Sequence, residues 1–317
     1  MSEAALRIWG QAIKLTGFAD EELAEVFDTF GGSIDVIADG REPQLTVHRQ
    51  HGSAAGAGER RSRHRGGSPA GKYFLDGTPF DGAEQQRDIT IVSEGSGCDV
   101  YAEDDALLVV AGDSATIVAD RLPQMLLSDV IEDWLLCRSR ANGAVQVHCA
   151  AWLDDGRATL AVGSSGAGKS TELFRNVRAG SSFLSNDRAF LRLRDGALEV
   201  RSFPLPVNIG CGTIRALDLP IPHHGLGDHD KIRLRAPEVA ERFDVDYETW
   251  YPVARVVCTS LADFNANIYW DEDACHPFWV RGWHPGTLPG AVVEKLTAAL
   301  EPLIIERRLL TGQGAVR

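Results

Sequence analysis

The chain has 317 residues, of which 44% are hydrophobic and 24% charged, the ordinary balance of a globular protein that can bury a core. Its formal net charge of -13 disfavours binding to nucleic acid or to an anionic membrane surface. No apolar run approaches the roughly 20 residues of a membrane span, and no signal peptide is recognisable. The six scattered cysteines favour reduced thiols over disulfides or a zinc site, so we expect a cytoplasmic protein.

Residues 1–121 are expected to form a smaller α+β region. The first 35 residues suggest helices, including one that Asp20 caps and that ends at Gly31. Short strands are expected at residues 89–92, 107–111 and 116–118.

Residues 49–69 are rich in arginine and almost free of apolar side chains. This composition predicts a disordered or solvated segment. The alternative is a basic arm that grips an acidic partner or a phosphorylated substrate.

Residues 122–317 are expected to form a second, α/β domain. It opens with an amphipathic helix within residues 123–143. Two hairpins follow, with turns at 154–156 and 194–196. The four expected strands are residues 145–153, 158–162, 182–193 and 197–201, and later helices are expected at 237–243 and 290–308.

Residues 163–171 read GSSGAGKST and fit the pattern G-x-x-x-x-G-K-[ST]. A short apolar strand precedes the run and a helix follows it, which is the context that a phosphate-binding loop requires. The expected nucleotide-binding residues are Gly163, Ser164, Ser165, Gly166, Ala167, Gly168, Lys169, Ser170 and Thr171. The glycines let backbone N–H groups face a polyphosphate, Lys169 adds a positive charge, and the Ser170 hydroxyl can reach Mg²⁺. The competing interpretation is a purely structural glycine-rich turn.

Two further polar residues lie on otherwise apolar strands. His148 is fifteen residues upstream of the loop. It either has a functional role at the nucleotide site or is a hydrogen-bonded structural histidine. A lone aspartate on such a strand needs a compensating partner. Asp187 therefore either binds Mg²⁺ or accepts the substrate proton, or it forms a salt bridge with Arg188 or Arg192.

The segment 223–230, HHGLGDHD, contains glycine and is preceded by proline. It is expected to be a solvated loop, with a substrate-closing loop and a metal site as alternatives. Lys231 and Arg233 follow at strand spacing and either reach a phosphate or an acidic substrate or lie on the surface.

Three segments together resemble the HPr kinase/phosphorylase family: His148 on the first strand of a hairpin, the loop 163–171 after its second strand, and the segment 184–188, LSNDR. The likeness covers residues 122–215, and the segment 198–201 is a weaker match. The family shares its nucleotide fold with phosphoenolpyruvate carboxykinase. The resemblance therefore implies a P-loop nucleotide-binding domain built on a hairpin-connected mixed sheet.

The resemblance implies an ATP-dependent kinase that transfers the γ-phosphate to a hydroxyl of a protein, a peptide or a small-molecule alcohol. Lys169 and the loop would hold ATP, Ser170 and Asp187 would hold Mg²⁺, and His148 would lie near the transferred group and assist the base. It also suggests a homo-oligomer.

One departure from the family concerns the catalytic base. The family has paired aspartates where this chain has Asn186 and Asp187, and an amide cannot accept the substrate proton at neutral pH. Asp187 then takes both tasks, or His148 moves the proton, or the chain is a non-catalytic nucleotide-binding sensor or accessory protein, a pseudokinase. On this basis Asn186→Asp, which restores the pair, is expected to preserve or raise activity.

Overall fold

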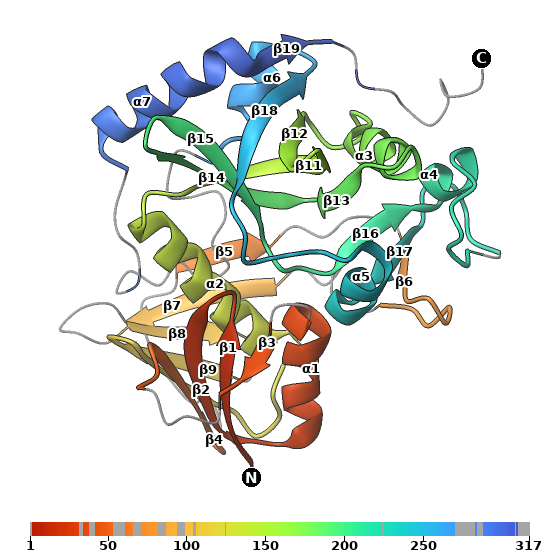
Figure 1. Ribbon diagram of the computed structural model, residues 1–317. Coiled ribbons are helices and arrows are strands. Elements are labelled where there is room, and N and C mark those ends of the chain that lie inside the picture. Colours follow the sequence, from red (N-terminus) through yellow and green to blue (C-terminus); the bar gives the residue numbers. More distant parts are fainter. Residues whose placement is uncertain are drawn as a thin grey trace. The chain divides into compact units, whose positions relative to one another are not determined.

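The computed structural model describes residues 2–31, 34–37, 42–52, 61–65, 71–80, 87–93, 99–103, 106–123, 125–223, 225–269, 283, 288–307 and 309. The chain forms two compact units of mixed α/β structure (Figure 1). Unit 1 comprises Met1–Pro69, Asp81–Arg138 and Cys275–Pro285, and unit 2 comprises Ala70–Phe80, Ser139–Ala274 and Gly286–Arg317.

Unit 1 contains a nine-stranded sheet in the order β3-β1-β2-β4-β10-β9-β8-β7-β5. Its strands are β1 (Ser2–Ile8), β2 (Gln11–Phe18), β3 (Ile34–Val36), β4 (Leu45–Gln50), β5 (Arg61–Arg65), β7 (Arg87–Ser93), β8 (Asp99–Glu103), β9 (Ala106–Ala111) and β10 (Ser114–Val118), and its helices are α1 (Asp20–Phe30) and α2 (Leu126–Ala141), which continues into unit 2. β4 runs parallel to β2 and β10, whereas the other pairs are antiparallel.

The helical expectation for the first 35 residues is correct for α1 and wrong before it. The N-cap of α1 is Ala19, so the expectation that Asp20 caps this helix is also wrong. β1 and β2 form a hairpin whose turn residues, Trp9 and Gly10, have φ values of 51° and 75°. Two positive φ angles in a row match the twist of a two-residue hairpin. Buried Ile13 and Leu15 alternate with more exposed neighbours along β2, which is a period of two and not a helical period.

The basic segment 49–69 is partly ordered. The strand β5 lies within it and pairs antiparallel with β7, so the expectation of an unstructured segment is wrong for those five residues. β4 extends to Gln50 at the start of the segment. Residues 53–60 and 66–69 lie outside the described part of the chain.

Unit 2 carries a mixed seven-stranded sheet and a three-stranded sheet ordered β16-β17-β6. Its strands are β6 (Lys72–Tyr73), β11 (Val145–Asp154), β12 (Arg157–Val162), β13 (Ser182–Ser185), β14 (Arg188–Arg194), β15 (Ala197–Ser202), β16 (Val207–Gly210), β17 (Lys231–Leu234), β18 (Tyr251–Cys258) and β19 (Ile304–Glu306). Its helices are α3 (Lys169–Arg178), α4 (Cys211–Ala216), α5 (Ala236–Phe243), α6 (Leu261–Asn265), α7 (Gly290–Leu300) and the 3₁₀ turn η4 (Glu301–Leu303). The two expected hairpins, β11–β12 and β14–β15, are both present.

The larger sheet of unit 2 closes on itself. The pairing order β12-β11-β14-β15-β18 returns to β12, because β18 pairs antiparallel with β15 through Tyr251 and Pro252 and parallel with β12 from Val253 onward. β11 pairs with three strands. Residues 145–148 pair with β14, residues 149–154 pair with β12, and residues 151–153 also pair with β13. Apolar side chains of these strands, with Leu296 and Leu300 of α7, form the core.

Two expected elements of unit 2 are shorter than the sequence suggested. The strand 182–193 is interrupted at Asn186 and Asp187, although the register along β11 is kept, with Ser185 opposite Ala151 and Arg188 opposite His148. The helix 290–308 ends at Leu300, because Pro302 cannot continue an α-helix. η4 and β19 follow it, and β19 pairs parallel with β18.

None of the helices in the described part of the chain is long and apolar enough to cross a membrane. Cys137, Cys149, Cys211 and Cys258 are buried free thiols, as expected for these four.

Candidate functional site

The predicted phosphate loop has the local geometry of one. β12 ends at Val162, the loop turns through Gly166 and Gly168 with φ values of 82° and 100°, and α3 begins at Lys169. A left-handed backbone at both positions requires glycine. At Gly163 a Cβ would be tightly packed, since it would lie 3.1 Å from a carboxylate oxygen of Asp263 and 3.2 Å from the Ala167 Cβ.

Lys169 lies beneath the loop and is only 7% exposed. Its ammonium group donates to the carbonyl oxygens of Gly163 at 2.6 Å and Ser164 at 3.0 Å. Burial lowers the pKa of Lys169, and the charge of Asp187 opposes that shift. A bound anion would stabilise this partly desolvated cation further.

Asp263 fixes the beginning of the loop. Its carboxylate accepts hydrogen bonds from the Ser164 N–H at 3.1 Å and from the Thr259 hydroxyl. α6 carries this residue, and the Ser260 side chain caps α6 by accepting from the Asp263 N–H at 3.1 Å. Asp263 was not among the site residues expected from the sequence. Ser260 and Asp263 show the spacing of a helix cap, but nothing local indicates the contact 99 residues away.

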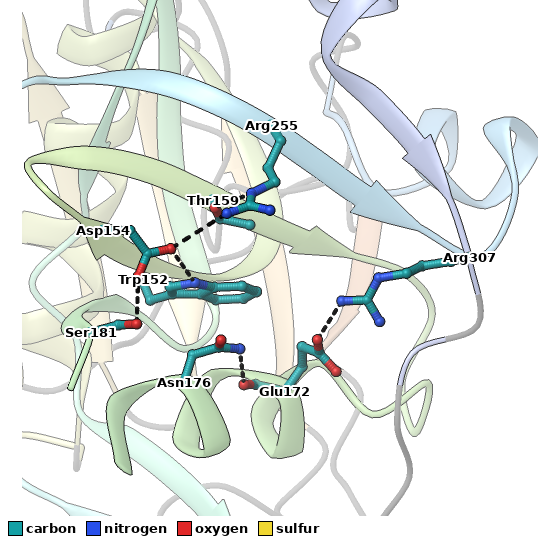
Figure 2. Close-up of polar contacts among 8 residues, drawn as sticks. All are labelled: Trp152, Asp154, Thr159, Glu172, Asn176, Ser181, Arg255 and Arg307. Atoms are coloured by element: carbon teal, nitrogen blue, oxygen red, sulfur yellow. Dashed lines mark hydrogen bonds and ion pairs between the residues drawn. The ribbon is translucent and has the colours of Figure 1, made fainter. Parts of the chain in front are cut away.

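Polar contacts fix α3 and the outer end of the β11–β12 hairpin (Figure 2). On α3, the buried Glu172 carboxylate pairs with Arg307, and the Asn176 amide donates to the Glu172 carbonyl at 2.8 Å. Glu172 therefore serves as an anchor of α3 and does not line the cavity described below. At the hairpin, Asp154 accepts from the Trp152 indole at 3.2 Å and the Ser181 hydroxyl at 2.6 Å.

His148 and Asp187 come together where the strand that pairs with β11 is interrupted between β13 and β14. Nε2 of His148 lies 3.5 Å from Oδ1 of Asp187, and the two side chains are 29% and 51% exposed. Burial lowers the pKa of His148, with Lys169 and Arg188 acting in the same direction and Asp187 against it. The imidazole is therefore neutral at pH 7 and able to accept a proton.

The neighbours of this pair have separate roles. Nε of Arg188 lies 3.9 Å from Oδ2 of Asp187, so one of the two salt bridges considered from the sequence is present. Arg192 instead pairs with Glu199, with a nitrogen-to-oxygen distance of 2.7 Å. Burial raises the pKa of the Cys149 thiol to about 12, so this thiol stays protonated and is not a nucleophile.

Asn186 is held by a hydrogen bond to a neighbouring strand. It is 8% exposed, and its amide nitrogen donates to the Asn208 carbonyl of β16 at 3.0 Å. Its Oδ1 is buried without a hydrogen-bond partner. The hydrogen bond requires a donor at position 186, which an ionised aspartate cannot supply.

The loop borders a cavity of about 410 Å³. Polar groups and glycines line it: Lys72, His148, Ser165, Gly166, Gly168, Lys169, Ser170, Thr171, Asn186, Asp187, Asn208, Gly210, Thr213 and Lys231. The structure thus brings eight of the eleven expected site residues to one cavity. Gly163, Ser164 and Ala167 belong to the loop without lining it.

The chain's own residues offer few metal ligands here. No cluster of three or more histidine, cysteine or acidic side chains that could hold a metal is found among the described residues, which include most of the loop 223–230. Ser170 and Asp187 both line the cavity, and a hydroxyl and a carboxylate are oxygen donors of the kind that Mg²⁺ accepts.

Comparison of the chain with protein-family models gives no match, and comparison with curated proteins gives none.

Proposed function

We propose that this chain is an ATP- and Mg²⁺-dependent kinase that transfers the γ-phosphate to a hydroxyl acceptor. The observation that carries the proposal is the juxtaposition of a complete phosphate loop with a neutral histidine and an exposed carboxylate around one polar cavity. We also propose that unit 2 has the phosphoenolpyruvate carboxykinase-like P-loop fold. Its hairpin-connected mixed sheet, with the loop after the second hairpin strand, supports that assignment.

Nucleotide phosphates would bind to the loop amides and to the N-terminus of α3, where the helix dipole favours negative charge. Lys169 contributes a cation at the same place, and Ser170 and Asp187 would hold Mg²⁺. When bound, Mg²⁺ neutralises charge on the phosphates. The anchoring of the loop by Asp263 and of α3 by Arg307 means that little reorganisation is needed on binding.

In the reaction, the acceptor oxygen forms a bond to the γ-phosphorus as the bond to the bridging oxygen of ADP breaks. The acceptor's proton passes to Asp187 or to His148, which lie 3.5 Å apart. Desolvation keeps His148 unprotonated, so either group of the pair is able to act as the base.

The second candidate is a non-catalytic nucleotide-binding protein, which Asn186 at the first position of the acidic pair favours. The test measures ADP formation from MgATP, alone and with a panel of alcohols and serine peptides. Asp187→Asn should lower the rate by about 10²–10⁴-fold, the range for a positioned acid–base group, while ATP affinity changes little. Asp195→Asn, at an exposed turn, is the matched control.

Wild-type protein that binds ATP but forms no ADP with any acceptor would identify the non-catalytic protein. Full activity in Asp187→Asn would remove Asp187 from the mechanism.

A further inference from the structure

The cavity lining has a second part that does not belong to the phosphate-loop motif. Lys72 of β6, Asn208 and Gly210 at β16, Thr213 of α4 and Lys231 of β17 line it, and we call these five residues the lysine wall. The wall is built on the three-stranded sheet, and the Thr213 hydroxyl lies 3.1 Å from the hydroxyl of Thr171 in α3. Phosphate loop and lysine wall therefore border one space.

Two lysines of the wall are cross-strand neighbours. β6 runs parallel to β17 with Lys72 in register with Lys231, which places both side chains on one face of the sheet. Like charges directly opposite each other on a sheet repel, and an anion bound near both would reduce that repulsion. The register thus places two ammonium-bearing side chains at the border of the cavity.

Lysine side chains are concentrated at this cavity, although the chain as a whole is negatively charged. Three of the chain's five lysines (14, 72, 169, 231 and 295) line the cavity, in a protein with a net charge of -13. Among the described residues of the lining, Asp187 supplies the single carboxylate. Lys231 also acts on Lys169 by repulsion and lowers its pKa. This excess of ammonium groups would attract an anionic ligand.

We propose that the acceptor alcohol itself carries an anionic group, a phosphate or a carboxylate, and that Lys72 and Lys231 bind this group. The inference rests on the proposed function, in which the loop and Lys169 already serve the nucleotide phosphates. The two lysines of the wall come from another sheet and line the cavity beside the loop, where a second anion would meet them. Their contacts would orient the acceptor, and a neutral alcohol would bind poorly.

The test separates this second anion from the nucleotide. The protein is first saturated with Mg²⁺ and AMP-PNP, an ATP analogue that fills the γ-phosphate position, and binding of the analogue is measured by calorimetry. Inorganic phosphate and acetate are then titrated separately into the complex. The wild-type complex should bind at least one of them, and Lys72→Gln and Lys231→Gln should each weaken that binding about tenfold or more. Lys295→Gln, at an exposed position of α7, should leave it unchanged.

The stronger of the two probes identifies the anionic group of the acceptor. The inference is overturned if neither anion binds the AMP-PNP complex, or if the two lysine variants bind as wild type does. It is also overturned if those variants lose AMP-PNP affinity about tenfold, since the lysines would then belong to the nucleotide while the proposed function stands. Failure of wild-type protein to bind AMP-PNP would overturn the proposed function and this inference with it.

Discussion

At the scale of single residues, the interruption between β13 and β14 gives two adjacent side chains opposite surroundings. Asn186 is buried and donates to the carbonyl of Asn208, whereas Asp187 is half exposed beside His148. The Asn186 amide thus connects the interruption between β13 and β14 to β16. This geometry changes the expectation that Asn186→Asp would preserve or raise activity.

We predict that Asn186→Asp destabilises the protein by about 1–3 kcal/mol at pH 7, because it places a buried carboxylate against the Asn208 carbonyl. The variant should regain stability as the pH falls, since a protonated carboxyl can donate where an ionised one cannot. Urea unfolding at pH 7 and pH 5 measures both effects, with Asn186→Ala as the uncharged control. A variant as stable as wild type at pH 7 would contradict the assignment.

A second prediction concerns His148, whose pKa is lowered by burial from its ordinary value of 6.5. As the pH falls through 6.5, the unfolded chain takes up a proton before the folded protein does, so the free energy of unfolding decreases. Above pH 6.5 the imidazole is neutral in both states and its contribution is constant.

We therefore expect the free energy of unfolding to decrease less in His148→Gln than in wild type as the pH is lowered from 7.5. Urea titrations at several pH values measure this difference. His229→Gln, at an exposed loop position, should follow wild type. Identical pH dependence in wild type and His148→Gln would contradict the burial argument.

At the scale of elements, α3 depends on a residue from the far end of the chain. The Glu172 side chain is 5% exposed and pairs with Arg307, 135 residues later, with Arg175 more distant at 3.8 Å. Removing one partner of such a pair leaves a buried charge poorly compensated.

Arg307→Ala should lower the free energy of unfolding by about 1.5–3 kcal/mol, the range for a hydrogen bond to a charged group. Adding Glu172→Gln should recover part of the loss, because the buried carboxylate is gone. Arg194→Ala, which breaks an exposed pair with Asp195, should change stability by less than about 1 kcal/mol in the same denaturation assay. Equal effects of the two arginine variants would show that Arg307 does not anchor the helix.

The sequence predicted those elements whose signals are local. The strand, glycine loop and helix around Lys169 and the two hairpins carry their turn and capping residues within a few positions of one another. Three contributing residues come from distant parts of the chain: Asp263 contacts the loop, Arg307 pairs with Glu172 of α3, and Lys72 pairs in register with Lys231. No local sequence pattern indicates these contacts. The β1–β2 hairpin was missed because its turn is Trp9-Gly10, without the asparagine or aspartate that usually marks such a turn.

At the scale of the whole molecule, the chain divides into two units, and the candidate site lies entirely within unit 2. That unit includes the segment Ala70–Phe80, which supplies β6 and Lys72 from within the N-terminal part of the chain. The expected boundary at residue 121 thus leaves out a strand that contributes to the cavity. The overall negative charge makes the basic cavity a preferred place for a small anion.

The proposed function requires nucleotide to bind at the loop 163–171, and calorimetric titration with MgADP measures that binding. Wild-type protein should bind, and Lys169→Ala should lose about 1.5–3 kcal/mol of binding free energy, roughly 10- to 150-fold in affinity, because it removes a charged donor from the phosphates. Lys295→Ala, an exposed lysine of the same unit that lies outside the cavity, should bind as wild type does. Equal affinity in wild type and Lys169→Ala, or no binding by wild type, would contradict the assignment of this loop.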